Sequence, residues 1–158
     1  MKVKESGEEI QIYDFSAVEA YKIARKLEEE GIGFYKKLLG TVEDPKVKEV
    51  LIYLLGEERD HLRLFEEMLE REDPESLDDS GENILDILDT KVFNSPRNEE
   101  LTTDFNKALQ LGITIEKRSL AFFLEMLKHT ESEEGKNGLK KIIEEEKQHW
   151  EELKRLIQ

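Results

Sequence analysis

The chain has 158 residues and no cysteine, so a disulfide framework, a zinc knuckle or a thiolate-bound iron centre cannot form. Its formal net charge of −14 argues against nucleic acid or an anionic membrane as a partner and favours cations. No apolar run reaches the roughly 18 residues of a membrane span, and the first ten residues lack the apolar core of a signal peptide. We therefore expect a cytoplasmic protein that does not contact a membrane.

Capping signals and apolar periodicity predict two long helices in the first half of the chain. Residues 1–15 are expected to form an N-terminal arm, either extended or docked. The first helix would begin after Ser16, which can form a capping box with Glu19, and end near residue 39. The second would begin with Asp44 as its cap and Pro45 at its first position, and end near residue 71.

Two further helices are predicted in the second half, from about residue 101 to 129 and from about 131 to the C-terminus, the latter weakened by two glycines. Residues 72–100 form a long polar connection in which residues 84–93 could make a short helix. Short links make each helix pair an antiparallel hairpin, while the long connection can run the length of a bundle. The prediction is an all-α four-helix bundle over residues 16–158, with a long crossover between its two hairpins.

The two predicted hairpins are repeats of each other. "LGEERDHL" in the second helix is matched by "IEEEKQHW" in the fourth, at an offset of 146 − 58 = 88 residues. The same offset relates three pairs of candidate site residues: Glu28 and Glu116, Glu58 and Glu146, and His61 and His149. Such a repeat predicts a bundle with a pseudo-twofold axis.

Helical geometry places these carboxylates in the core. At about 100° per residue, Leu51, Leu54 and Phe65 lie within roughly 40° of Glu58. The same arithmetic places one inward-facing glutamate on each helix. A buried carboxylate costs several kcal/mol, and four together repel one another, so two divalent cations would compensate them. A ligand set of carboxylates and imidazoles without sulfur favours iron, with manganese possible, over zinc or copper.

At these residues the chain resembles the rubrerythrin and ferritin-like di-iron carboxylate superfamily, over residues 16–158. "LEEEGIGFY" at 27–35 resembles the first-helix motif of that family, and "IEKRSLAFF" at 115–123 resembles its third-helix motif. The resemblance implies a ferritin-like bundle that holds two iron ions. By position, Glu28 and Glu116 would be terminal ligands, Glu58 and Glu146 would bridge the metals, and His61 and His149 would each complete one metal's ligand set. Tyr35 would hydrogen-bond to a ligand carboxylate and is the candidate catalytic side chain.

The resemblance also implies a function. It predicts a non-haem di-iron oxidoreductase that reacts with hydrogen peroxide or dioxygen, as in defence against oxidative stress. Rubrerythrins carry a rubredoxin-like domain with four cysteines, so this cysteine-free chain is expected to receive electrons from an external, rubredoxin-like donor protein. Ser119 stands where rubrerythrins have an additional glutamate. A homodimer is a further expectation, because related bundles often dimerise.

Two other interpretations stay open. The chain could be a ferroxidase or an iron-binding and storage protein, in which iron itself is the substrate. Alternatively, the repeat could be a scaffold in which the glutamates hydrogen-bond to the histidines without metal. A single Glu-x-x-His motif is more often a surface contact, but two such motifs at matching core positions argue against that interpretation. Among the remaining residues, His129 is expected to cap a helix end or to lie in solvent, Phe123 to lie in the core, and Trp150 to lie in the core or a dimer contact.

Overall fold

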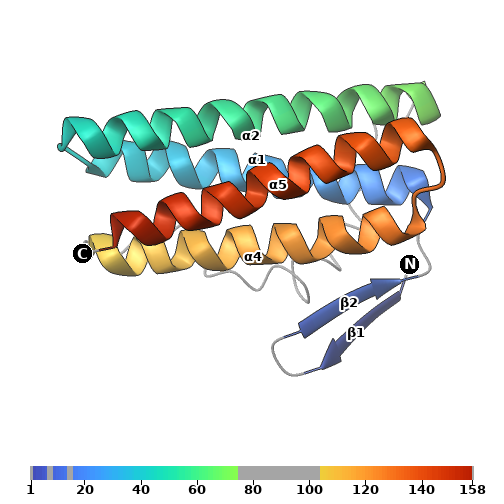
Figure 1. The fold of residues 1–158 in the computed structure, drawn as a ribbon, viewed down its shortest axis with the longest axis horizontal. Helices are drawn as coiled ribbons and strands as arrows, with labels where there is room; N and C mark the ends of the chain where they lie inside the picture. Colours follow the sequence, from blue (N-terminus) through green and yellow to red (C-terminus); the bar gives the residue numbers. More distant parts are fainter. Residues whose placement is uncertain (1, 7–8, 14–15, 75–103, 158) are drawn as a thin grey trace.

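Four long helices lie side by side in the computed structural model, which describes residues 2–6, 9–13, 16–74 and 104–157 (Figure 1). The helices are α1 (Ala17–Thr41), α2 (Pro45–Glu72), α4 (Phe105–His129) and α5 (Glu133–Leu156). The closest packing occurs between α1 and α2 and between α4 and α5, while α1 also contacts α4 and α2 contacts α5. The predicted bundle of two hairpins is therefore confirmed. None of the helices in the described ranges is long and apolar enough to cross a membrane.

The N-terminal segment contains a β-hairpin made of β1 (Lys2–Ser6) and β2 (Glu9–Tyr13). The strands pair antiparallel, from Lys2 opposite Tyr13 to Ser6 opposite Glu9. The hairpin lies beside α4, which β2 contacts (Figure 1). The sequence analysis expected an arm here, either extended or docked, and did not predict that two strands pair. The short helix predicted at 84–93, and almost all of the connection at 72–100, lie outside the described residues.

Side-chain caps set the starts of α1 and α2 where the sequence predicts them. The Ser16 hydroxyl accepts a hydrogen bond from the Glu19 N–H at 3.2 Å. The Asp44 carboxylate accepts one from the Lys46 N–H at 2.9 Å, and Pro45 occupies the first turn, where no N–H is needed.

The two helices of the second half begin later than predicted, because their caps were not recognised. Asp104 caps α4 by accepting hydrogen bonds from the N–H groups of Asn106 and Lys107, at 3.0 and 3.3 Å. Ser132 caps α5 by accepting one from the Gly135 N–H at 3.1 Å. A Cβ at Gly135 would lie 2.7 Å from the Ser132 hydroxyl oxygen, so a glycine at this position leaves room for the cap.

Buried apolar side chains form two clusters, one toward each end of the bundle. One contains Phe65 and Phe123, whose rings stack with centroids 5.3 Å apart, which confirms Phe123 as a core residue. The other contains Phe34, Leu51 and Leu109. The buried glutamates and histidines lie between the two clusters, where the surroundings screen charge poorly.

Candidate metal centre

The six predicted ligands come from all four helices and are buried together in the middle of the bundle. None of the six residues has more than 3% of its surface exposed to solvent. α1 supplies Glu28, α2 supplies Glu58 and His61, α4 supplies Glu116, and α5 supplies Glu146 and His149. The repeat therefore brings matching residues to one place, as the sequence analysis expected.

Their ligand atoms fall into two groups, and within each group all the atoms lie within 4.8 Å of one another. One group consists of Glu28, Glu58, His61 and Glu146, and the other of Glu58, Glu116, Glu146 and His149. Each group offers three carboxylates and one imidazole. Because Glu58 and Glu146 belong to both groups, the two potential cation sites adjoin and share two carboxylates.

The two imidazoles present the same ring atom to the cluster. Nδ1 of His61 lies 3.0 Å from a carboxylate oxygen of Glu146, and Nδ1 of His149 lies 2.9 Å from one of Glu58. The rings are stacked, with centroids 5.6 Å apart and planes inclined by 18°. The two hairpins therefore contribute equivalent nitrogen donors from adjacent positions.

Several of these buried atoms have no hydrogen-bond partner among the described residues. They are Oε1 of Glu28, both carboxylate oxygens of Glu146, and Nδ1 of His61 and of His149. An unsatisfied buried polar group costs about 1–3 kcal/mol. Five such atoms in one cluster are the expected arrangement for a metal centre, whose cations would satisfy them together. The residues present therefore fit a dinuclear metal site.

The carboxylates hold protons strongly when no cation is present. Burial raises the pKa of Glu28 to about 7. Burial, reinforced by neighbouring carboxylates, raises the pKa of Glu58 and of Glu146 well above the usual value. Glu116 differs: burial would raise its pKa, but its interactions with Glu146, with the nearby imidazole of His149 and with the hydroxyl of Tyr35 lower it overall. Cations entering this cluster would displace the protons.

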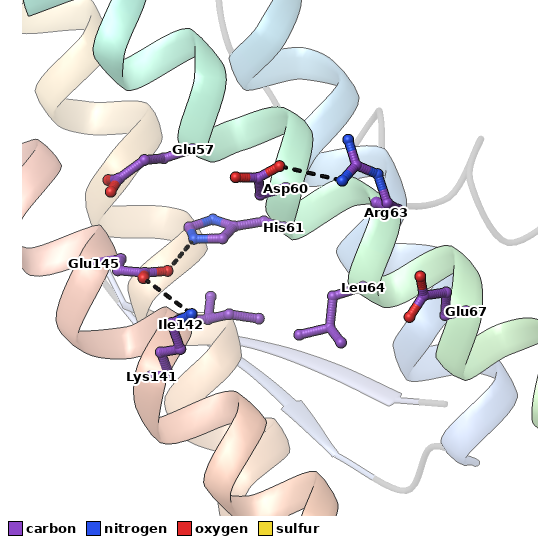
Figure 2. Close-up of a pocket in the computed structure, with 9 residues that line it drawn as sticks. All are labelled: Glu57, Asp60, His61, Arg63, Leu64, Glu67, Lys141, Ile142 and Glu145. Atoms are coloured by element: carbon purple, nitrogen blue, oxygen red, sulfur yellow. Dashed lines mark hydrogen bonds and ion pairs between the residues drawn. The ribbon is translucent and has the colours of Figure 1, made fainter.

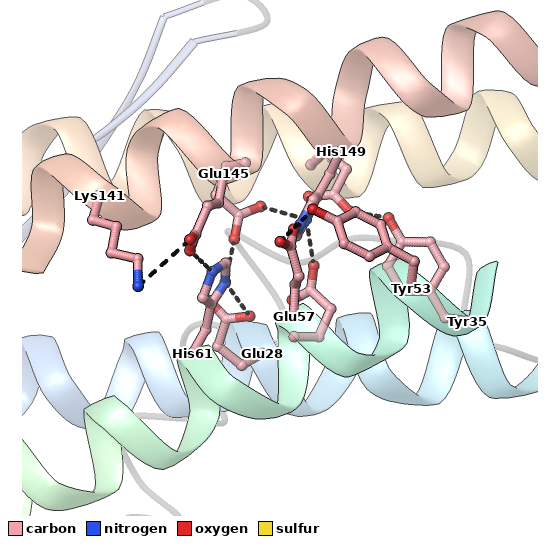
Figure 3. Close-up of polar contacts among 11 residues, drawn as sticks. Glu28, Tyr35, Tyr53, Glu57, His61, Lys141, Glu145 and His149 are labelled. Carbon is pink, nitrogen blue, oxygen red and sulfur yellow. Dashed lines mark hydrogen bonds and ion pairs between the residues drawn. The ribbon is translucent and has the colours of Figure 1, made fainter. Parts of the chain in front are cut away.

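The outer nitrogen of each histidine contacts a carboxylate of the opposite hairpin. Nε2 of His61 lies 2.7 Å from Glu145 (Figure 2), and Nε2 of His149 lies 2.6 Å from Glu57 (Figure 3). When the imidazole is neutral, its Nε2–H donates to this carboxylate, so that the lone pair on Nδ1 faces the cluster. Glu57 and Glu145 therefore select the ring tautomer that a metal ligand requires.

Sequence analysis missed these two outer carboxylates. The signal was present, because Glu57 and Glu145 directly precede Glu58 and Glu146 and are related by the same offset, 145 − 57 = 88. A helical projection turns them away from the core face of their own helix, and their side chains are 20% and 23% exposed. Their partners lie on the other hairpin, which the geometry of one helix cannot reveal.

Tyr35 is buried, and its hydroxyl donates a hydrogen bond to Glu116. The matching position in the second hairpin is Phe123, which has no hydroxyl. Gly31 lies beside the cluster, where a Cβ would sit 3.1 Å from a Glu58 carboxylate oxygen, so the glycine leaves room for that side chain. Among the other candidates, His129 is exposed at the end of α4, as expected.

The rubrerythrin family profile matches residues 19–157. The chain belongs to the rubrerythrin family. A solved structure of a protein from Thermotoga maritima, described as a ferritin-like diiron-carboxylate protein, is 23% identical to it with a TM-score of 0.69. The alignment covers 92% of this chain and 97% of the other. No significant match to this rubrerythrin-family chain is found among curated proteins.

Proposed function

We propose that this rubrerythrin-family chain is a di-iron oxidoreductase that reduces hydrogen peroxide or dioxygen with electrons from an external donor protein. The observation that carries the proposal is the pair of ligand groups that share Glu58 and Glu146. We assign these two glutamates as bridging ligands. Glu28 and His61 would complete one metal's ligand set, and Glu116 and His149 would complete the other.

The surrounding residues prepare this centre for the reaction. Glu57 and Glu145 hold the imidazoles in one orientation, which strengthens their donation to a metal. The apolar clusters on both sides exclude water from the cluster. When bound, the two iron ions would supply the capacity to exchange electrons with the oxidant.

Tyr35 is the candidate for proton supply. Burial, together with the negative charge of Glu116, raises the pKa of Tyr35 well above its usual value. The hydroxyl therefore keeps its proton at neutral pH and donates it in a hydrogen bond to the carboxylate of Glu116. This places a proton donor directly behind one proposed ligand.

We also propose that the electrons come from a separate donor protein and that the protein is cytoplasmic. The sequence contains no cysteine, so no thiolate-ligated iron centre within it can supply electrons. A small rubredoxin-like protein is the proposed donor. The ligand set also accepts manganese, and metal analysis of anaerobically purified protein would identify the ion that is loaded.

Anaerobic iron loading followed by oxidation tests the function. We expect about two iron ions per chain, as in di-iron bundles. Mixing with peroxide or dioxygen in a stopped-flow spectrometer should then produce the near-ultraviolet and visible absorption of oxidised iron, and a reduced donor should reverse it. Iron uptake far above two ions per chain would instead indicate a ferroxidase or storage protein. If the chain bound no iron, the result would support the interpretation in which the glutamates hydrogen-bond to the histidines without a metal.

A further inference from the structure

A pocket of about 280 Å³ opens on the surface between α2 and α5 (Figure 2). These two helices contact each other much less than the helices within each hairpin do. Residues that line the pocket include Asp60, His61, Leu64, Glu67, Ile142 and Glu145. The pocket therefore reaches a proposed metal ligand, His61, from the outside.

The imidazole of His61 forms the partition between this pocket and the buried cluster. Its Nε2 faces Glu145 in the pocket wall at 2.7 Å, and its Nδ1 faces Glu146 inside the cluster at 3.0 Å. The ring of His61 therefore lies between the pocket wall and the buried cluster. A change of side-chain rotamer, which needs no movement of the backbone, would connect them.

The charge of the pocket favours a cation. Four carboxylates and two basic side chains line it, besides His61, which gives a formal charge of 2 − 4 = −2; these charged residues are Glu57, Asp60, Glu67 and Glu145, with Arg63 and Lys141. A cleft lined mainly by one sign of charge raises the local concentration of the opposite ion and speeds its association. Glu145 contacts His61 directly, so a cation in the pocket would meet a carboxylate beside the imidazole that separates it from the buried cluster.

The matching position at the His149 end is held more firmly. Tyr53 corresponds to Lys141 in the repeat, since 141 − 53 = 88, and its hydroxyl donates a 2.6 Å hydrogen bond to Glu57 (Figure 3). Lys141 forms only a long ion pair with Glu145, at 3.8 Å, which is beyond hydrogen-bond distance. Glu145 is therefore the freer of the two outer carboxylates, and it lies at the His61 end.

We propose that this pocket is the passage through which hydrated divalent cations reach the buried cluster, with Glu145 as the last carboxylate contact and His61 as the movable partition. The inference rests on the proposed metal-binding function. Cations would reach the site through the face between α2 and α5, on the side where His61 lies.

Cobalt(II) loading kinetics of the full, metal-free chain test the route. The probe is cobalt(II) alone, followed by its visible d–d absorption in a stopped-flow spectrometer, with a separate titration for the amount bound at equilibrium. In the double variant Asp60→Asn with Glu67→Gln, the pocket loses two negative charges. We expect loading at low ionic strength to slow by roughly three- to tenfold. The difference should shrink at high salt, while the equilibrium amount is unchanged.

A matched control removes the same charge elsewhere. Glu151 and Glu152 occupy the positions that correspond to Arg63 and Leu64 at the other end of the repeat. The double variant Glu151→Gln with Glu152→Gln should load at the rate of the unmodified chain. A steric variant, Leu64→Phe, narrows the pocket without changing its charge, and should slow loading at every salt concentration.

The outcomes separate the route from the function. Equal loading rates in the unmodified chain and the pocket variants, with normal equilibrium binding, overturn the passage and leave the metal site intact. If the pocket double variant and the control double variant slow cobalt loading equally, the passage is also overturned, because the slower loading then follows from the lower net charge of the protein and not from the pocket. No cobalt bound by the unmodified chain overturns both the passage and the proposed function.

Discussion

The hairpin of α1 and α2 and the hairpin of α4 and α5 contribute equally to the buried cluster but differ around it. The three pairs of proposed ligands and the two outer carboxylates all match at an offset of 88 residues. In contrast, Tyr35 corresponds to Phe123, and Tyr53 corresponds to Lys141. Each candidate ligand group takes three residues from one hairpin and a single shared carboxylate from the other, so the repeat must be kept at these positions for the two groups to be equivalent. The neighbouring positions carry no such requirement, and they give the two groups different hydrogen bonds and different access.

Removing the two shared carboxylates should have the largest effect, because it breaks both ligand groups at once. We expect the double variant Glu58→Gln with Glu146→Gln to lose both metal ions. Iron should raise the thermal stability of the unmodified chain, since a ligand that binds only the folded state stabilises it, but should leave this variant unchanged. Metal analysis and thermal unfolding with and without iron would measure this.

Glu70, which is exposed on α2, provides the control. Glu70→Gln should bind iron and respond to it as the unmodified chain does. If added iron stabilised the double variant as much as the unmodified chain, the two shared glutamates would not be ligands.

The pH dependence of the metal-free chain should be the next largest effect. The folded-state pKa of Glu28 is raised from 4.5 to about 7, and that of His61 from 6.5 to about 9, where its contacts with Glu146 outweigh the opposing effect of burial. The folded state therefore binds more protons than the unfolded state. The contribution of Glu28 is complete below pH 4.5 and is lost as pH rises through 7, and that of His61 is complete below 6.5 and is lost through 9.

Denaturant unfolding in the presence of a chelator would measure this slope. We expect the free energy of unfolding to fall between pH 5 and 9, by about 1.4 kcal/mol per pH unit for each extra proton bound. The variant Glu28→Gln should show a flatter curve between pH 5 and 7. Stability that rises with pH under these conditions would contradict the assignment. With metal present, the trend should reverse, because cations and protons compete for the same atoms.

The outer carboxylates test whether the two ends of the cluster are equivalent. Glu145→Gln and Glu57→Gln should each weaken metal binding by roughly 10- to 100-fold, since such partners fix the orientation of a histidine ligand. Equal losses would show that both histidines depend on their outer contact to the same extent. Isothermal titration with cobalt(II) would measure the affinities, and an unchanged affinity in both variants would remove the proposed positioning role.

The sequence was sufficient to predict the bundle and its six inward residues, for identifiable physical reasons. Long amphipathic helices have a strong period. Helical geometry and the match to Glu116 at an offset of 88 residues both identify Glu28 among three consecutive glutamates. Burial of Glu28 at 1% exposure agrees with that choice. The ligand roles themselves and the identity of the metal stay predictions, because they depend on ions that the sequence does not specify.

The features that were missed depend on contacts between distant segments or on short signals. The bond between His61 and Glu145 crosses from one hairpin to the other, so no periodicity within α2 or α5 predicts it. The start of α4 was placed too early, because apolar periodicity does not mark a boundary as a cap such as Asp104 does. The N-terminal strands are five residues each; the alternation of Ile10, Gln11 and Ile12 is compatible with an extended segment, but it does not specify the strand with which that segment pairs.

The smallest expected effect concerns Tyr35, where the two hairpins differ most directly. Tyr35→Phe removes a buried hydroxyl that donates to Glu116, and we expect a loss of about 1.5 kcal/mol in the free energy of unfolding, as for a hydrogen bond to a charged group. Tyr53→Phe is the matched control, because it removes the same atom from a residue that is 52% exposed and bonded to Glu57. Its effect should stay within about 0.5 kcal/mol, as for surface substitutions. Equal effects in denaturant unfolding would mean that the Tyr35 hydroxyl contributes no more than a surface contact. A phenylalanine, which the second hairpin has at the matching position 123, would then serve equally well at position 35.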